Sequence, residues 1–340
     1  MTTLMRREID EIPDATARLL EKSEKSLRRA GDSLRELDPA VIATIARGSS
    51  DHAAHFLKYA AEIQAHVPVA SLGPSLASIY GVQLRLDRAA AIAVSQSGKS
   101  PDIVAMTRGA REGGALTLAL VNTLPSPLGD AAALAIDIAA GPELAVAATK
   151  SFVNSAVAGL AILAEWTVDE QLKRAVADLP MHFREALKLD WSDLNSAIEG
   201  ADSLYTLGRG PALAIAGEAS LKCKETCELH AESYSAAEVL HGPVSLVAPN
   251  FPVIAFAARD CAESSVADMA DRLAAKGAHV FVTSERAALA KRLPFLSTGH
   301  PLTDTLALSL PFYGFVEQLS RARGFNPDAP AALSKVTQTR

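Results

Sequence analysis

Short apolar runs alternate along this chain with longer segments in which apolar residues recur every three or four positions. The short runs predict buried strands, and the longer segments predict helices packed against them. Such alternation is typical of a parallel sheet built from βα units. In the first half, strands are predicted at residues 41–46, 67–71, 89–94, 116–121 and 134–138, and helices near residues 52–64, 101–112 and 149–165.

The second half of the chain repeats this pattern. Residues 43–48, 90–94 and 113–119 have counterparts of similar composition at residues 204–210, 253–257 and 276–282. The offset is roughly 162 residues in all three cases, as a tandem duplication would give. The sequence therefore predicts two α/β domains of similar fold, with the boundary near residues 176–192, where the alternation pauses.

Composition narrows the function classes. The chain has 340 residues, 49% hydrophobic and 21% charged, which fits a globular protein large enough for two domains. The net charge of −6 and the lack of a basic stripe argue against a nucleic-acid-binding surface. No apolar run is long enough to span a bilayer and the first residues lack a signal-peptide core, so we expect no membrane association and a cytoplasmic location.

Cysteine is rare, with Cys223, Cys227 and Cys261 as the complete set. An odd and small number of cysteines predicts no disulfide framework. Cys223 and Cys227 are four residues apart, but no further Cys/His pair has a suitable spacing, so we expect buried thiols and no metal site.

Three hydroxyl side chains and a glycine follow the predicted strand at residues 89–94. The segment Ser95-Gln96-Ser97-Gly98-Lys99-Ser100 leads into a predicted helix with Pro101 near its start. A turn of this kind presents backbone N–H groups and the positive end of a helix dipole, which suit a phosphate. Because no P-loop or GxGxxG fingerprint is present, a small phosphorylated metabolite is favoured over a nucleotide. The alternative is a serine-rich turn that only caps the helix.

A second hydroxyl turn, Arg47-Gly48-Ser49-Ser50-Asp51, follows the first predicted strand. Ligands of open parallel sheets bind at the carboxyl ends of strands, so we expect both turns to converge on one anion. Alternatively, Ser50 or Asp51 only caps the next helix. The second half has Ala258-Arg259-Asp260-Cys261 in place of the serine turn, which predicts one phosphate site per chain.

Candidate chemistry in the second half centres on Lys222 and Glu225, which share a helix face because they are three residues apart. A carboxylate beside an ammonium group can move a proton while the ammonium stabilises a developing oxyanion; a surface ion pair is the alternative. His241 lies in an irregular segment before Gly-Pro, where a histidine can be functional or structural. Lys335 lies in a Pro-rich tail, which either closes over a site or is a solvated end.

Together these segments resemble the double sugar-isomerase (SIS) family, which includes the isomerase half of glucosamine-6-phosphate synthase (glutamine–fructose-6-phosphate aminotransferase) and the SIS-type glucosamine-6-phosphate deaminases. The resemblance covers nearly the whole chain and is carried by residues 5–9, 48–50, 95–98, 143–150, 221–225, 230–232, 238–243 and 333–335. It implies two flavodoxin-like α/β/α domains, each with a five-stranded parallel sheet. The expected parts are an N-terminal helical segment (1–34), two SIS domains (35–175 and 192–323) and a tail (324–340) that closes over the active site.

The resemblance also implies ligand-binding residues. The phosphate ligands come from the two hydroxyl turns and are Ser50, Ser95, Gln96, Ser97 and Ser100. Backbone contacts to the sugar are implied for Val146 and Ala148. No metal or organic cofactor is implied, because the carbonyl group of the substrate itself acidifies the C–H bond.

Four catalytic roles are implied in the same way. Glu225 matches the residue that moves a proton between C1 and C2, and Lys222 matches the one that stabilises the enolate oxygen. His241 matches the ring-opening histidine, which in the family comes from the partner subunit. Lys335 matches the tail lysine that forms a Schiff base with the open-chain ketose. A homodimer with the active site at the subunit interface is therefore expected.

Two departures from the synthase bear on function. No cysteine precedes Cys223, so we expect no glutaminase chemistry, and Arg47 replaces a small residue, which suggests a differently arranged site or interface. The expected reaction converts glucosamine 6-phosphate and water to fructose 6-phosphate and ammonia. The alternatives are an isomerase or deglycase for another phosphosugar, such as fructosamine 6-phosphate or galactosamine 6-phosphate, and a non-catalytic sugar-phosphate sensor.

Overall fold

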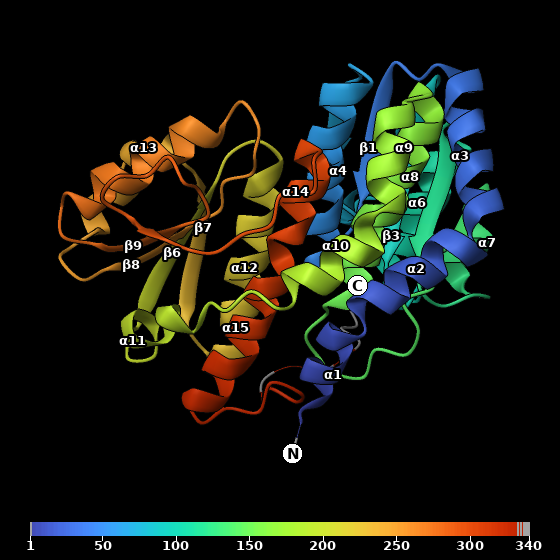
Figure 1. Cartoon of the computed structure of the whole chain (residues 1–340). Helices are drawn as coiled ribbons and strands as arrows, with labels where there is room; N and C mark the ends of the chain where they lie inside the picture. The colour runs from blue at the N-terminus through green and yellow to red at the C-terminus, as the bar shows by residue number, and fades with distance from the viewer. Residues whose placement is uncertain (1, 332, 334, 336–340) are drawn as a thin grey trace. The chain divides into compact units, whose positions relative to one another are not determined.

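The computed structural model describes residues 2–331, 333 and 335. The chain divides into two compact units, each assembled from separate segments (Figure 1). The sheet A unit comprises the described residues of 12–143, 150–178 and 335–340. The sheet B unit comprises those of 1–11, 144–149 and 179–334.

Sheet A is a five-stranded sheet in which every pair of neighbouring strands is parallel. Its order is β2-β1-β3-β4-β5. The strands are β1 (Val41–Ile45), β2 (Val69–Ser71), β3 (Ala89–Ser95), β4 (Leu116–Val121) and β5 (Leu134–Asp137). All seven residues of β3 are buried, as expected for a central strand covered on both faces.

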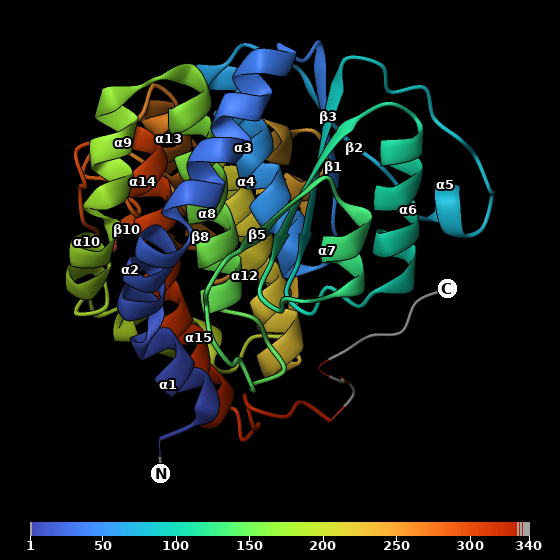
Figure 2. The ribbon, with the colours of Figure 1, turned by 90° about the vertical axis from the view of Figure 1, so that its right-hand side faces the viewer.

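Helices cover both faces of sheet A. Successive strand residues point to opposite faces, so Ala43 and Ile45 pack with α6 (Pro101–Glu112) and α7 (Pro127–Ala131), whereas Ile42 and Thr44 face the other side. Figure 2 shows α6 and α7 on one side of the sheet and the remaining large helices on the other. Those helices are α3 (Glu24–Leu37), α4 (Ser49–Gln64) and α8 (Lys150–Thr167), and two further helices, α2 (Ile12–Lys22) and α9 (Glu170–Ala177), pack on α8; the short α5 (Ser75–Ser78) lies beside α6.

Sheet B is also five-stranded and parallel, with the order β10-β9-β8-β6-β7. Its strands are β6 (Ser203–Gly208), β7 (His230–Ser235), β8 (Pro252–Ala255), β9 (His279–Val282) and β10 (Lys291–Arg292). Its helices are α1 (Leu4–Asp10), α10 (Leu179–Ala186), α11 (Asn195–Ile198), α12 (Pro211–Cys227), α13 (Glu263–Ala274), α14 (Pro301–Ala307) and α15 (Ser309–Ala322), with 3-10 turns η1 (Ser192–Leu194), η2 (Glu238–Leu240) and η3 (Pro243–Leu246).

The two sheets are built alike. Read from its other edge, sheet B has the order β7-β6-β8-β9-β10, which matches β2-β1-β3-β4-β5 strand for strand. The predicted fold class, two α/β units with five-stranded parallel sheets, is confirmed. The individual strands β7 and β10 were not predicted, because β7 has the polar sequence HAESYS at a sheet edge and β10 is two exposed residues. Among the described residues, no helix combines the length and apolar character that a bilayer crossing requires.

The cysteines provide a test of the packing of sheet B. Cys223 and Cys227 are buried on α12, whereas Cys261 is exposed. Burial raises the pKa of Cys223 well above its ordinary value and that of Cys227 to about 11. Since the thiolate is the reactive form, these two thiols should be inert at pH 8.

We therefore expect the native protein to react with one equivalent of Ellman's reagent (a thiol-specific disulfide) at pH 8, and with three equivalents in 6 M guanidinium chloride, about the concentration that unfolds most domains. The Cys261→Ser variant should lose the native-state reaction. If all three thiols of the folded protein reacted rapidly with the reagent, α12 would not be packed as described.

Candidate functional site

The two hydroxyl turns lie at one edge of sheet A. The glycine-serine turn (residues 47–50) follows β1, and the serine turn (residues 95–100) follows β3. β1 and β3 are parallel neighbours in which Ile45 pairs with Ala93. The two turns begin just beyond this pair, with Arg47 two residues after Ile45 and Ser95 two residues after Ala93. They are therefore neighbours at the carboxyl edge of sheet A, and their convergence on one anion stays a prediction.

The serine turn is tight and its hydroxyl groups differ in exposure. The buried Ser95 Oγ accepts a hydrogen bond from the N–H of Gly98 at 3.1 Å, and Ser97 Oγ accepts from the N–H of Lys99 at 3.3 Å. Gly98 has φ of +64°, and a Cβ there would lie 2.5 Å from Ser126 Oγ. Only glycine therefore fits this position. Gln96, Ser97 and Ser100 remain partly exposed.

The helices that follow these two turns begin without a side-chain cap. The N-cap of α4 is Gly48, which has no side chain, and that of α6 is Ser100, whose hydroxyl bonds no backbone N–H of its helix. By contrast, Ser126 caps α7 and Asp169 caps α9. The first N–H groups of a helix need a partner and attract anions. The Ser100 hydroxyl therefore does not cap α6, which disfavours the alternative that the serine turn only caps that helix.

Arg47 joins the glycine-serine turn to the first turn of α6. Its Nε donates to Asp102 Oδ2 at 2.6 Å, and its Nη2 lies 2.5 Å from the same oxygen. Asp102, in the first turn of α6, is completely buried, whereas the Arg47 side chain is 47% exposed. The sequence analysis noted Arg47 as a departure from the synthase. It could not identify Asp102 as the partner, because the two residues are 55 positions apart in the chain.

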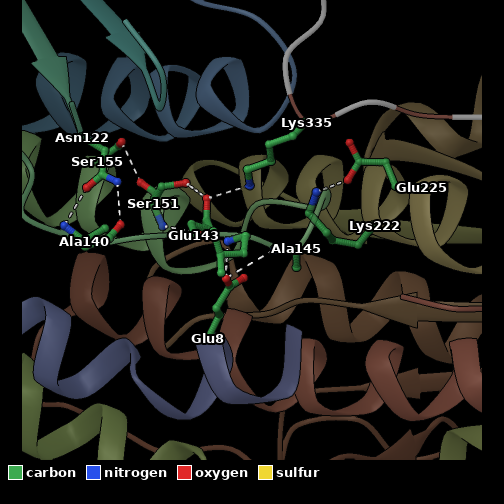
Figure 3. A network of polar contacts seen from close by, with 12 residues as sticks. Glu8, Asn122, Ala140, Glu143, Ala145, Ser151, Ser155, Lys222, Glu225 and Lys335 are labelled. Atoms are coloured by element: carbon green, nitrogen blue, oxygen red, sulfur yellow. Dashed lines mark hydrogen bonds and ion pairs between the residues drawn. The ribbon is translucent and has the colours of Figure 1, made fainter. Parts of the chain in front are cut away.

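Lys335 is held by a buried carboxylate in the sheet A unit. Its Nζ lies 3.4 Å from Glu143 Oε2, and Figure 3 shows it pointing towards that carboxylate. Glu143 also accepts hydrogen bonds from Ser151, at 3.0 Å from the backbone N–H and 2.5 Å from the hydroxyl group. An amine in such an ion pair must lose its proton before it can attack a carbonyl. The closure of the tail (324–340) over the active site stays a prediction, because residues 332, 334 and 336–340 lie outside the described residues.

In the sheet B unit, the segment 144–149 carries the two residues expected to contact a sugar. The N–H of Val146 donates to the carbonyl of Asp328 at 3.1 Å, so a ligand contact from Val146 would have to come from its carbonyl oxygen. The neighbouring Leu144 and Ala145 N–H groups donate to Glu8 Oε1, which fixes the segment. Val146 and Ala148 are each half-buried.

Helix α12 carries three charged residues on one face: Glu218, Lys222 and Glu225, which we call the lysine–carboxylate cluster. Lys222 Nζ is 3.5 Å from Glu218 Oε1 and contacts Glu225 Oε2 directly. Lys222 and Glu218 are fully buried, whereas the Glu225 side chain is 22% exposed. Figure 3 shows the Lys222 amine pointing towards the Glu225 carboxylate. Glu218 Oε1 also accepts a hydrogen bond from Tyr313 on α15 at 3.1 Å.

The cluster keeps Lys222 charged. Burial alone lowers the pKa of Lys222, but the nearby charges of Glu218 and Glu225 outweigh it, so the pKa is raised above its ordinary value. A buried ammonium beside a partly exposed carboxylate can stabilise negative charge while the carboxylate exchanges a proton. The alternative of a solvent-exposed ion pair is excluded, because Lys222 has no exposed side-chain surface.

Glu218 was missed by the sequence reasoning. Its spacing of four residues from Lys222 was the available signal, since residues i and i+4 share a helix face. A glutamate within the small-residue run Ala216-Gly217-Glu218-Ala219-Ser220 was a second one, because such a run predicts burial and a buried carboxylate needs partners.

His241 is placed differently. It follows η2, its side chain is exposed, and its backbone N–H donates to the carbonyl of Glu238 at 2.8 Å. Among the described residues of the sheet B unit, the imidazole of His241 forms no hydrogen bond or ion pair with Lys222 or Glu225. The role expected for His241 involves a partner subunit and remains a prediction.

The edge of sheet B that corresponds to the serine turn is filled by the protein itself. The guanidinium of Arg259, after β8, donates to the carbonyl oxygens of Ala257 and Thr283 and lies 3.8 Å from the ring centre of Phe295. Its Nε is 3.3 Å from Glu263. An internal cation thus occupies the ends of β8 and β9, which supports the prediction of a single phosphate site. No cluster of three or more His, Cys, Asp or Glu side chains suited to a metal ion occurs within residues 2–331, 333 and 335.

Comparison with known proteins gives a consistent picture. A family model described as "SIS domain" matches residues 38–164 and 197–288. A glutamine–fructose-6-phosphate aminotransferase (isomerizing) from Symbiobacterium thermophilum is 32% identical over 314 residues, which cover 86% of this chain and 51% of that protein. The chain therefore spans about half the length of this curated relative.

Two solved structures extend the comparison. A "putative phosphosugar isomerase" from Silicibacter pomeroyi DSS-3 is 56% identical, with a TM-score of 0.93 over 96% of this chain and 100% of that one. The C-terminal domain of glucosamine-fructose-6-phosphate aminotransferase from Francisella tularensis is 25% identical, with a TM-score of 0.84 over 96% and 98% of the two chains.

The buried cluster on α12 predicts unequal effects of two tyrosine substitutions. Tyr313→Phe removes a donor from the buried carboxylate of Glu218 and should lower the free energy of unfolding by about 1–3 kcal/mol. Tyr205→Phe is the matched control, since Tyr205 donates at 3.2 Å to the neutral carbonyl of Pro243, and should cost about 0.5–1.5 kcal/mol. Urea unfolding followed by circular dichroism measures both. A larger loss for Tyr205→Phe would contradict the role given to Tyr313.

Proposed function

The chain belongs to the SIS-domain family, and from that membership we propose that it is a phosphosugar isomerase that deaminates glucosamine 6-phosphate to fructose 6-phosphate. The observation that carries the proposal is the lysine–carboxylate cluster on α12, in which a fully buried Lys222 contacts the partly exposed Glu225. A non-catalytic sugar-phosphate sensor would gain nothing from a buried ammonium held against a carboxylate.

Substrate binding is assigned to the turns at the edge of sheet A. The proposed phosphate ligands are Ser50, Ser95, Gln96, Ser97 and Ser100, which lie in the two turns that precede or begin α4 and α6. Val146 and Ala148 are proposed to contact the sugar through their backbone atoms.

The proposed reaction is a proton transfer between neighbouring carbons. In the open-chain form of the substrate, Glu225 would take the proton from C2 and return it to C1. The ammonium group of Lys222 would stabilise the negative charge that develops on the C1 oxygen. The resulting ketose imine then adds water at C2 and releases ammonia, which gives fructose 6-phosphate. The carbonyl group of the substrate acidifies the C–H bond, so the proposal assigns no step to a cofactor.

Two further residues complete the proposal. His241 from a partner subunit would assist ring opening, which makes the proposed active form a homodimer. Lys335 would pass its proton to Glu143, its ion-pair partner, and the neutral amine would add to the C2 carbonyl of the open-chain ketose. Loss of the C2 oxygen as water would then give the Schiff base. The location proposed for this reaction is the cytoplasm.

The direct test is to supply glucosamine 6-phosphate to the purified protein and to measure ammonia and fructose 6-phosphate in parallel. Equal amounts of both products would support the deaminase. If no ammonia is released, but the protein interconverts fructose 6-phosphate and glucose 6-phosphate when either is supplied, it is a plain aldose–ketose isomerase. Tight binding of these sugars with no turnover would indicate a sensor.

Within the proposed reaction, Glu225→Gln should lower kcat by about 10²–10⁴-fold, because the amide cannot accept the C2 proton. KM should change little, since Glu225 is not assigned to the phosphate. The matched control is Glu228→Gln, which makes the same change at an exposed position just after α12. Steady-state ammonia release by the two variants distinguishes the outcomes, and equal activity would remove Glu225 from the mechanism.

A further inference from the structure

We infer that Arg47 is a phosphate-binding residue of this chain, in addition to the ligands proposed above. The inference rests on the proposed function only in taking the serine turn as the place where a phosphate binds. Arg47 comes two residues after Ile45 of β1, and Ile45 pairs with Ala93, which is two residues before Ser95. Its guanidinium therefore crosses the edge of sheet A from the glycine-serine turn to the first turn of α6, next to the serine turn.

Asp102 fixes the orientation of this guanidinium. The two groups share short contacts through Nε and Nη2, and Asp102 has no exposed surface. Asp102 is itself held by the start of α6, where its Oδ1 accepts from the N–H of Ile103 at 2.9 Å and the helix dipole favours its charge. An arginine that is already oriented loses less side-chain entropy when it binds an anion.

The remaining N–H groups of Arg47 are available. A guanidinium has five N–H donors, and the contacts to Asp102 engage only its Nε and Nη2 side. Nη1 has no hydrogen-bond partner within the described ranges 2–331, 333 and 335, and the side chain is 47% exposed. Arginine binds phosphate oxygens through directed, charge-assisted hydrogen bonds, which are stronger than those from serine hydroxyls.

The pair with Asp102 raises a competing explanation. Arg47 could serve only to neutralise a buried carboxylate that would otherwise repel a phosphate across the same edge. The two explanations differ in what happens when both charges are removed. If Arg47 only neutralises Asp102, removal of both restores binding; if Arg47 contacts the phosphate, binding stays weak.

The test is calorimetric binding of fructose 6-phosphate and of inorganic phosphate, which requires no turnover. Arg47→Met should raise Kd for fructose 6-phosphate by about 10- to 100-fold, the loss expected for a hydrogen bond to a charged group. Arg47→Lys keeps a charge beside Asp102 but loses the planar fork, so its Kd should also rise by about 10-fold. Arg108→Met, an exposed change of the same charge on α6, should bind as the unaltered protein does.

The double variant Arg47→Met/Asp102→Asn decides between the explanations. A Kd that stays at least about 10-fold weakened supports direct contact, and recovery to the original Kd overturns it. Unchanged binding by Arg47→Met, with unfolding temperatures matched by circular dichroism, also overturns it. If the unaltered protein binds fructose 6-phosphate but releases no ammonia from glucosamine 6-phosphate, the proposed reaction fails while the test of Arg47 stands. If it binds neither ligand, both fail.

Discussion

Parallel pairing of β1 with β3 is the constraint from which the site in sheet A follows. Each parallel strand must return through a helix, so the strand ends and the helix starts gather at one edge. There the glycine-serine turn and the serine turn are neighbours, and α4 and α6 begin without side-chain caps. The same edge brings Arg47 to Asp102. The backbone topology thus brings hydroxyl groups and a guanidinium to one edge of the sheet.

Helix α12 obeys a different constraint, the cost of burying charge. An unpaired ammonium in the interior is unstable, so Lys222 requires both Glu218 and Glu225. Glu218 in turn uses the hydroxyl group of Tyr313. Replacing such a cluster with apolar residues often leaves a protein as stable or more so, so its presence is weak evidence for a stabilising role. The proposed catalytic role would account for a buried ammonium that lies beside one partly exposed carboxylate.

The duplication shows how one architecture serves two purposes. Both sheets have the same strand order, and in both a turn follows the central strand. In sheet A that turn carries serines and Gly98. A glycine is required there because φ is positive and a Cβ would collide with Ser126. In sheet B the corresponding edge is filled by Arg259, which satisfies the carbonyl oxygens of Ala257 and Thr283. Similar folds thus differ in chemistry through a few residues at the strand ends.

The sequence by itself determined the elements whose apolar pattern is strong: β4 and α6 match their predicted bounds, and β1 and β3 do so to within one residue. It also determined that Lys222 and Glu225 share a face, because that depends only on helical spacing. It did not reveal β7, a polar edge strand, nor Glu218 as a third member of the cluster. The partner of Glu218 outside α12 is Tyr313, 95 residues further along the chain, and the partner of Arg47 is Asp102, 55 residues further along. Spacing along the chain is local, whereas burial and ion pairing arise only when distant segments pack, so the tertiary structure alone decided them.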